Sequence, residues 1–255
     1  MLRARVIPVL LLHNGGLVKT RQFKEPKYIG DPLNAVKIFN EKEVDELMFV
    51  DIDATAEGRE PRLPLLRNLA AQSRMPLCYG GGVTNAQQAS RIVATGFEKV
   101  SVSAAALKRP ALIKEMAECV GTQSVVVTID VKVNKLFSGY TVYTHNGNQK
   151  HAIPLVEYCQ QAASYGAGEI VINSIDRDGK MEGYDLGLAL AVRGAVDIPM
   201  SVLGGAGNTG HLQALIDAVG VVGAAAGSMF VFNGPYRAVL ISYKRPERLF
   251  GQTTL

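Results

Sequence analysis

Residues 75–82 read MPLCYGGG, and residues 198–205 read IPMSVLGG. Both stretches hold a proline, a short apolar run and a pair of glycines in the same order, 123 positions apart. Each is typical of a buried strand that ends in a glycine turn before a helix. Glu46 and Ile52-Asp53 correspond to Glu169 and Ile175-Asp176 at the same offset. Repetition at a fixed interval indicates a duplicated unit, with chance similarity between strand–helix units as the alternative.

Outward from these two stretches, short apolar runs alternate with helical segments along the whole chain. The expected strands lie near 5–11, 46–51, 76–80, 98–103, 124–130, 168–174, 199–203 and 221–226. The expected helices lie at 32–44, 62–73, 85–95, 109–119, 152–165, 185–196, 208–219 and 234–243. Eight such pairs in 255 residues predict an α/β fold, a closed (β/α)₈ TIM barrel that forms a single domain over 1–255. The duplication predicts half-barrels at about 1–121 and 122–255, and a doubly wound open sheet is the alternative fold.

Two segments interrupt this alternation. Residues 132–144 alternate around Ser138-Gly139, with Leu136 among the apolar positions, which predicts a hairpin inserted after the fifth strand. Residues 13–30 are long for a strand-to-helix connection, so we expect an irregular loop of the kind that serves as a lid.

Composition excludes several classes of protein. Hydrophobic residues are 47% of the chain and charged residues 20%, which argues against disorder, and the net charge of +4 is dispersed, which argues against nucleic-acid binding. No apolar run is long enough to cross a membrane. The three cysteines form no C-x-x-C and the histidines no ligand pair, so we expect reduced thiols, no metal and a cytoplasmic protein.

The glycine runs suggest binding of anions. Backbone N–H groups of Gly81-Gly82 and Gly204-Gly205 can approach a phosphate closely, and Ser103 and Gly227-Ser228 follow the next strands, where they could complete two cups. Two such cups would suit a phosphorylated small molecule, although glycine could merely permit tight turns there. The pattern at 205–210 fits G-x-G-x-x-G but lacks a following acidic residue, so no dinucleotide or other cofactor is expected.

Charged residues gather at both predicted ends of the barrel. At the carboxyl ends of strands lie five carboxylates suited to general acid–base work or, alternatively, to capping and ion pairs: Asp51, Asp53, Asp130, Asp176 and Asp178. At the opposite ends, Arg5, Glu46, Lys99 and Glu169 would bring together two positive and two negative charges. From the pattern alone, that group reads as a structural ring of salt bridges.

Four segments together resemble one known family. Residues 49–60 (FVDIDATAEGRE), 79–83 (YGGGV), 176–179 (DRDG) and 204–207 (GGAG) resemble the cyclase subunit of imidazole glycerol phosphate synthase, and the similarity covers nearly the whole chain. The resemblance implies a half-barrel duplication and a bisphosphorylated ribulose-type substrate on the top face. It also implies a glutaminase subunit on the bottom face, whose ammonia passes through the barrel to a lyase and ring-closing step in histidine biosynthesis.

The resemblance also implies roles for residues. Arg5, Glu46, Lys99 and Glu169 match the family's gate around the ammonia passage. Gly81, Gly82, Gly204, Gly205 and Ser228 match its phosphate cups, with Ser103, Gly227 and Lys19 as further candidates. Asp130 matches one of two catalytic aspartates, and Asp51 and Asp176 are further catalytic candidates.

The sequence departs from the family at the top face. The family's first strand ends in Cys-Leu-Asp, whereas here it ends in Val9-Leu10-Leu11, and Leu11 stands where the second catalytic aspartate is expected. A leucine transfers no proton, so the departure predicts a large loss of cyclase activity. Ser103 replaces an asparagine, Asn173 and Lys180 replace threonines, and Asp53 adds a charge.

Three functions remain open at this point. The altered top face resembles cyclase-like paralogues of surface-polysaccharide pathways, in which barrel and glutaminase supply ammonia to a sugar amidotransferase that amidates an N-acetyl sugar. This favours an ammonia conduit with weak or no cyclase activity. The alternatives are a genuine cyclase in which Asp53 or Asp51 replaces the lost carboxylate, and a non-catalytic activator of the glutaminase.

Overall fold

The computed structural model describes residues 3–134 and 138–243. Over these residues, eight parallel strands close into a barrel because β7 pairs with β10. These strands are β1 (Arg5–His13), β4 (Leu47–Asp51), β5 (Leu77–Gly80), β6 (Lys99–Val102), β7 (Val125–Val133), β10 (Glu169–Ser174), β11 (Met200–Leu203) and β12 (Gly223–Ala226). The predicted TIM barrel is therefore confirmed, and the open sheet is excluded.

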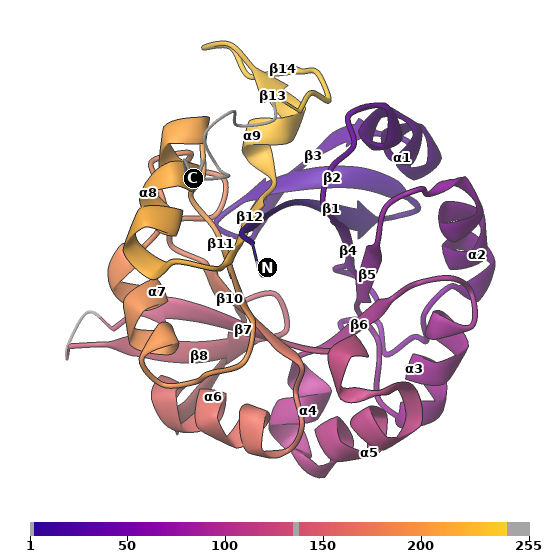
Figure 1. Cartoon of the computed structure of the whole chain (residues 1–255). Helices are drawn as coiled ribbons and strands as arrows, with labels where there is room; N and C mark the ends of the chain where they lie inside the picture. The colour runs from indigo at the N-terminus through magenta and orange to yellow at the C-terminus, as the bar shows by residue number, and fades with distance from the viewer. Residues whose placement is uncertain (1–2, 135–137, 244–255) are drawn as a thin grey trace, which may run out of the picture.

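Helices surround the strands in an outer ring (Figure 1). They are α1 (Pro32–Glu41), α2 (Leu63–Gln72), α3 (Ala86–Val93), α5 (Ala111–Val120), α6 (Leu155–Ser164), α7 (Leu186–Arg193) and α8 (Thr209–Val219), with the short α4 (Ala104–Lys108), η1 (Thr122–Ser124) and α9 (Ser228–Val231). The eight predicted strands and seven of the predicted helices are present, with ends that differ by three residues at most. Side-chain oxygens of Asn85 and Asn208, 123 positions apart, cap α3 and α8 by accepting from the N–H three residues on.

The eighth predicted helix, at 234–243, is wrong. The chain there forms a small hairpin of β13 (Phe232–Asn233) and β14 (Ala238–Val239). Gly234 has a φ of +70° and is followed by Pro235, so this pair favours a turn and breaks a helix. The last barrel strand is instead followed by the short α9.

The predicted irregular loop at 13–30 is also wrong. The segment forms β2 (Gly16–Arg21) and β3 (Lys24–Gly30), which extend β1 as an antiparallel sheet. Asn14-Gly15 makes the first turn with positive φ at both residues, and this dipeptide is a strong hairpin signal that the sequence analysis overlooked.

The predicted insertion after the fifth strand is confirmed in part. β7 pairs with β8 (Tyr140–Thr144), which pairs with β9 (Gln149–Pro154), and Leu136 lies outside the described residues. The helix predicted from 152 therefore starts three residues later, at Leu155. Each half of the barrel thus begins with a long strand that continues into two antiparallel strands.

Strand pairing repeats between the two halves. Leu47 pairs with Leu77 in the first half, and Ile170 pairs with Met200 in the second, each residue 123 positions after its counterpart. Leu11 pairs with Val50, and Asp130 pairs with Asn173. Leu11 and Asp130 therefore occupy equivalent positions in the barrel. In Figure 1 the first half, indigo to magenta, forms one side of the ring, and the second half forms the other.

The tip of each hairpin crosses the mouth of the barrel to the other half. In the first half, the backbone N–H of Gln22 donates to the carbonyl of Asp178 at 3.0 Å, and the hydroxyl of Thr20 donates to its carboxylate at 2.8 Å. In the second half, the amide of Asn146 donates to the carbonyl of Ile52 at 2.8 Å. The two halves are therefore tied together above the strand ends.

Candidate active site

A cavity of about 960 Å³ opens at the carboxyl ends of the barrel strands. Its polar wall carries Ser101, Thr128, Asp130 and Asn173, and its apolar wall carries Val9, Leu11, Val50 and Leu203. Phe23 and His145, from the two hairpins, line its mouth. The cavity thus lies where barrel enzymes place their active sites, and its wall combines apolar side chains with polar and charged ones.

Asp130 is the carboxylate best placed for proton transfer. Its Oδ1 accepts a hydrogen bond of 2.9 Å from the amide of Asn173, and the side chain faces the cavity. Burial raises the pKa of Asp130 to about 7, with a further rise from the charge of Asp178 and an opposing effect of the Asn173 hydrogen bond. A carboxyl that titrates near neutrality can both donate and accept a proton.

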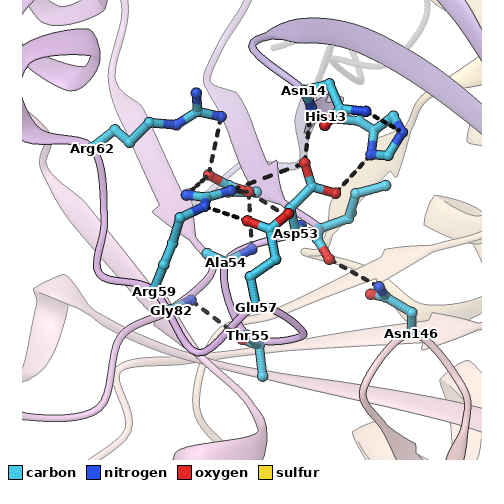
Figure 2. A network of polar contacts seen from close by, with 12 residues as sticks. His13, Asn14, Asp53, Ala54, Thr55, Glu57, Arg59, Arg62, Gly82 and Asn146 are labelled. Atoms are coloured by element: carbon cyan, nitrogen blue, oxygen red, sulfur yellow. Dashed lines mark hydrogen bonds and ion pairs between the residues drawn. The ribbon is translucent and has the colours of Figure 1, made fainter.

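Asp51 lines the same cavity but is held in an ion pair. Both of its oxygens accept from the guanidinium of Arg59 at 2.9 Å, and its Oδ1 also accepts from the backbone N–H groups of Asp53 and Ala54 (Figure 2). Asp51 as a whole is 3% exposed. This arrangement anchors the loop after β4, so a proton transfer by Asp51 stays a prediction.

Asp53 points toward the turn of the first hairpin (Figure 2), and it is not among the residues that line the cavity. Its two oxygens are bound by the ring Nδ1 of His13 at 2.6 Å and the N–H of Asn14 at 2.8 Å. Although burial opposes it, these hydrogen bonds hold the pKa of Asp53 below its usual value. The geometry therefore gives Asp53 no position from which to replace the missing carboxylate.

Asp176, the third catalytic candidate, lies outside the lining of the cavity. Its Oδ2 accepts from the N–H of Val133 at 2.7 Å, and its carbonyl accepts from Gln22 at 3.2 Å. These contacts connect the loop after β10 to both hairpins. A catalytic role for Asp176 remains a prediction.

The first predicted cup contributes to the large cavity. Gly81, Gly82 and Ser103 line it, together with Lys108 and Arg109 from the end of α4, which sequence reasoning missed. A Cβ on Gly81 would lie 2.3 Å from the carbonyl oxygen of Asp51, and Gly81 has a φ of +117°. Glycine is therefore required at this turn. Lys108 and Arg109 place two positive charges on the same part of the cavity wall.

The second predicted cup is a separate pocket of about 40 Å³. Its lining includes the residues predicted for it: Lys19, Gly204, Gly205, Gly227 and Ser228. Lys19 reaches it from β2, and a Cβ on Gly227 would lie 1.9 Å from the Lys19 Nζ. Burial lowers the pKa of Lys19 to about 8, against the opposing charge of Asp178. The cup is thus narrow and holds a buried ammonium.

The four charges predicted at the bottom of the barrel meet in a ring. Lys99 Nζ lies 2.8 Å from Glu46 and 2.8 Å from Glu169, and Arg5 pairs with both carboxylates, at 2.7 Å to Glu169. Although burial works the other way, the carboxylates raise the pKa of Arg5 and Lys99, and the two cations lower that of Glu169. An apolar layer separates this ring from the cavity: Ile7, Cys78, Val126, Val171 and Ala225.

The described residues offer neither a metal site nor a membrane-spanning helix. Across 3–134 and 138–243, no group of three or more His, Cys, Asp or Glu side chains could hold a metal ion. Over the same ranges, no helix is long and apolar enough to cross a membrane.

An eight-stranded α/β barrel with a polar-walled cavity at the strand ends defines the class, that of (β/α)₈ barrels with a top-face site. The profile of a family described as "Histidine biosynthesis protein" matches residues 5–236. The chain belongs to this family and, within it, to the HisF-type cyclase subunits of imidazole glycerol phosphate synthase.

Relatives of two kinds support this assignment. The chain is 52% identical over 247 residues to "Putative imidazole glycerol phosphate synthase subunit hisF3" of Vibrio vulnificus, covering 97% of this chain and 95% of the other. It is 46% identical over 249 residues to "Putative imidazole glycerol phosphate synthase subunit hisF2" of Pseudomonas aeruginosa, covering 98% and 99%. It is 38% identical over 248 residues to "Imidazole glycerol phosphate synthase subunit HisF" of Lysinibacillus sphaericus, covering 97% and 98%.

Proposed function

We propose that this barrel pairs with a glutaminase subunit, conducts ammonia from its bottom face to its top cavity, and has weak or no cyclase activity of its own. The observation that carries the proposal is Leu11. The pairing register makes it equivalent to Asp130, so one of two symmetric positions for a proton-transferring carboxylate holds a side chain that cannot exchange a proton.

The neighbouring carboxylates are already bound to other groups. Asp51 is paired with Arg59, and Asp53 is bound by His13 and Asn14. The Vibrio vulnificus and Pseudomonas aeruginosa relatives, whose names carry the word "Putative", are 52% and 46% identical to this chain, against 38% for the Lysinibacillus sphaericus relative, whose name does not. Both observations support a paralogue whose top face has changed.

The bottom face supports the conduit. Four buried or half-buried charges surround the barrel axis and are separated from the top cavity by small and medium apolar side chains. A neutral small molecule such as ammonia crosses an apolar layer more readily than ammonium, because burying an unpaired charge is costly. A glutaminase subunit docked on this face would release ammonia at the ring.

For the acceptor of this ammonia we propose an N-acetyl sugar of a surface polysaccharide, amidated by a third protein docked at the top face. This part of the proposal rests on the resemblance to the cyclase-like paralogues. The second candidate is a genuine cyclase in histidine biosynthesis, which the large cavity, Asp130 and the glycine cups favour. The third is a barrel that only activates the glutaminase.

Cyclase turnover with ammonium salt and the family's bisphosphorylated substrate separates the first two candidates. We expect a turnover at least about a hundredfold below that of the Lysinibacillus sphaericus chain, since a missing acid–base group typically costs that much or more. Turnover equal to that of the reference chain would overturn the proposal in favour of a genuine cyclase.

The conduit is tested in a complex with a HisH-type glutaminase subunit. In the complex, Lys99→Ala should uncouple glutamine hydrolysis from delivery of ammonia to an acceptor, because it removes one side of the ring. Lys114→Ala is the matched control, since Lys114 lies on the exposed face of α5 and pairs only loosely with Glu118 at 3.9 Å. If Lys99→Ala and Lys114→Ala leave coupling equally intact, the activator reading replaces the conduit.

A further inference from the structure

Asn173 connects the candidate acid to the second cup. It lies on β10, is 5% exposed, and lines both the large cavity and the small pocket. Its Nδ2 donates to Asp130 Oδ1 at 2.9 Å. One end of this amide therefore faces the carboxyl that titrates near neutrality.

The other end of the amide is an acceptor that lacks a donor. The Oδ1 of Asn173 is buried and has no hydrogen-bond partner among the described residues. It lies beside Gly204, since a Cβ on that residue would come within 3.2 Å of the oxygen. Gly204 has no side chain, so the buried acceptor lies directly beneath the glycine turn of the second cup. A buried acceptor without a donor is unfavourable, and a ligand that brings one gains affinity.

The first cup has no such acceptor at the equivalent position. Val50 corresponds to Asn173 through the repeated register, as Leu11 corresponds to Asp130. Gly81 corresponds to Gly204 at the offset of 123. The two cups therefore share a glycine turn but differ in the side chain beneath it, apolar in one and an unpaired amide oxygen in the other.

We propose that Asn173 is a positioning and specificity residue that makes the second cup select ligands carrying a hydrogen-bond donor. The ligand class is a phosphate in a protonated form, or a phosphate ester with a hydroxyl or amine beside it. Lys19 supplies the positive charge for the anion, and Asn173 Oδ1 accepts from the donor. Through its Nδ2, the same side chain fixes the carboxyl of Asp130. The inference rests on the phosphate binding that the sequence predicts at this cup.

Hydrogen phosphate and sulfate test this selectivity. At about pH 8 both carry two negative charges and have the same shape, but only phosphate has an O–H to donate. Titration of each anion into the full chain is followed by the NMR shifts of the Gly204 and Gly205 amides. We expect phosphate to bind about three- to tenfold more tightly than sulfate there, the usual range for one net hydrogen bond. The Gly81 and Gly82 amides serve as the internal control, with a ratio near one.

Two variants test whether the side chain at position 173 causes the preference for phosphate over sulfate. Asn173→Leu keeps the volume but removes both polar ends, so the ratio at the second cup should fall to about one while the first cup is unchanged. Val50→Asn adds an amide at the equivalent position and should raise the ratio at the first cup. A carboxyl titration should also show a higher pKa for Asp130 in Asn173→Leu, because the hydrogen bond that lowers it is lost while the charge of Asp178 stays.

The outcomes distinguish this inference from the proposed function. If neither anion shifts the Gly204 and Gly205 amides, phosphate binding at the second cup is wrong, and the selectivity fails with it. If both anions bind there equally in the wild type, or the ratio survives Asn173→Leu, only the role of Asn173 is overturned. An unchanged Asp130 titration in Asn173→Leu overturns its positioning role.

Discussion

Leu11 is the residue with the largest expected effect on chemistry. Leu11→Asp places a carboxyl at the position equivalent to Asp130, on the wall of the same cavity. We expect ammonium-dependent cyclase turnover to rise by about a hundredfold or more. We also expect a loss of roughly 1–3 kcal/mol in unfolding free energy, since a polar group replaces an apolar one. Steady-state kinetics and urea unfolding measure the two effects.

Leu11→Asn is the control for this change. It has nearly the same shape as the aspartate variant and is polar, but it exchanges no proton, so it should lose stability without gaining turnover. Equal turnover of the two variants would show that the limiting defect lies elsewhere on the top face, at Ser103 or Lys180.

Asp130 makes stability depend on pH in a defined direction. Its pKa is raised from 3.8 to about 7 in the folded protein, mainly by burial. Between these values the folded state binds the proton more tightly than the unfolded state, so the contribution of Asp130 to stability is present at about pH 4 and is lost as the pH rises through 7. When urea unfolding is measured across this pH range, the free energy of unfolding of Asp130→Asn should fall less steeply with rising pH than that of the wild type. Parallel curves would contradict the raised pKa.

Single residues were predictable where the sequence departs from the family it resembles. The family's Cys-Leu-Asp at the end of the first strand identified Leu11 as the position of the missing carboxylate, and the pairing register makes Leu11 equivalent to Asp130. The pairing of Asp51 with Arg59 and the unpaired oxygen of Asn173 were not predictable, because each depends on a side-chain contact between segments that the sequence does not align.

At the scale of elements, the loop after β4 is held by one buried ion pair. Arg59→Met removes two hydrogen bonds to Asp51 and leaves its carboxylate buried. Hydrogen bonds to charged groups contribute about 1.5–3 kcal/mol, and Arg59 is partly exposed, so we expect a loss near the lower end. The melting temperature should fall by about 3–6 °C, which differential scanning calorimetry measures.

Arg67→Met is the matched control for this loss. Arg67 lies on the exposed side of α2 in the same connection, and its replacement should change the melting temperature little. A similar fall in melting temperature in both variants would mean that the loss of one positive charge, and not the loss of the pair with Asp51, lowers the stability.

The elements were predicted well where apolar runs are continuous and poorly where turns decide the structure. The barrel strands are buried on both faces, so they read as short apolar runs. The strand β3 is mostly exposed and carries no apolar run, so the Asn14-Gly15 turn was the signal that could have revealed this hairpin. Residues 234–243 were predicted to be helical, but the turn at Gly234-Pro235 prevents a helix there.

At the scale of the whole molecule, we propose that the halves 1–121 and 122–255 are duplicates that fold as complementary parts. Their pairing registers repeat, and each half alone would expose unpaired edges, β1 and β6 in one and β7 and β12 in the other. We expect the two fragments, produced separately and mixed, to assemble into a species of the full-length size. Size-exclusion chromatography and circular dichroism measure the assembly.

Fragments cut elsewhere provide the control for this prediction. A pair divided after Ser164 splits the second half between β9 and β10 and should assemble less well. Equal assembly of both pairs would indicate that any barrel fragment pair associates, and it would remove support for the halves as folding units. The closed fold itself was predictable from eight alternating runs, whereas the tie between the halves above the mouth was not.

The equivalence of the two halves has a consequence for how such a barrel evolves. Barrel positions such as Leu11 and Asp130 exist in pairs, so a substitution in one half leaves its counterpart in the other half in place. A lineage that loses a reactive group from the first half keeps its closure, its passage and its second reactive group, and a single codon change restores the lost one more easily than a new site would arise. A duplicated barrel of this kind can therefore lose one reactive group and acquire a different function while it keeps its fold.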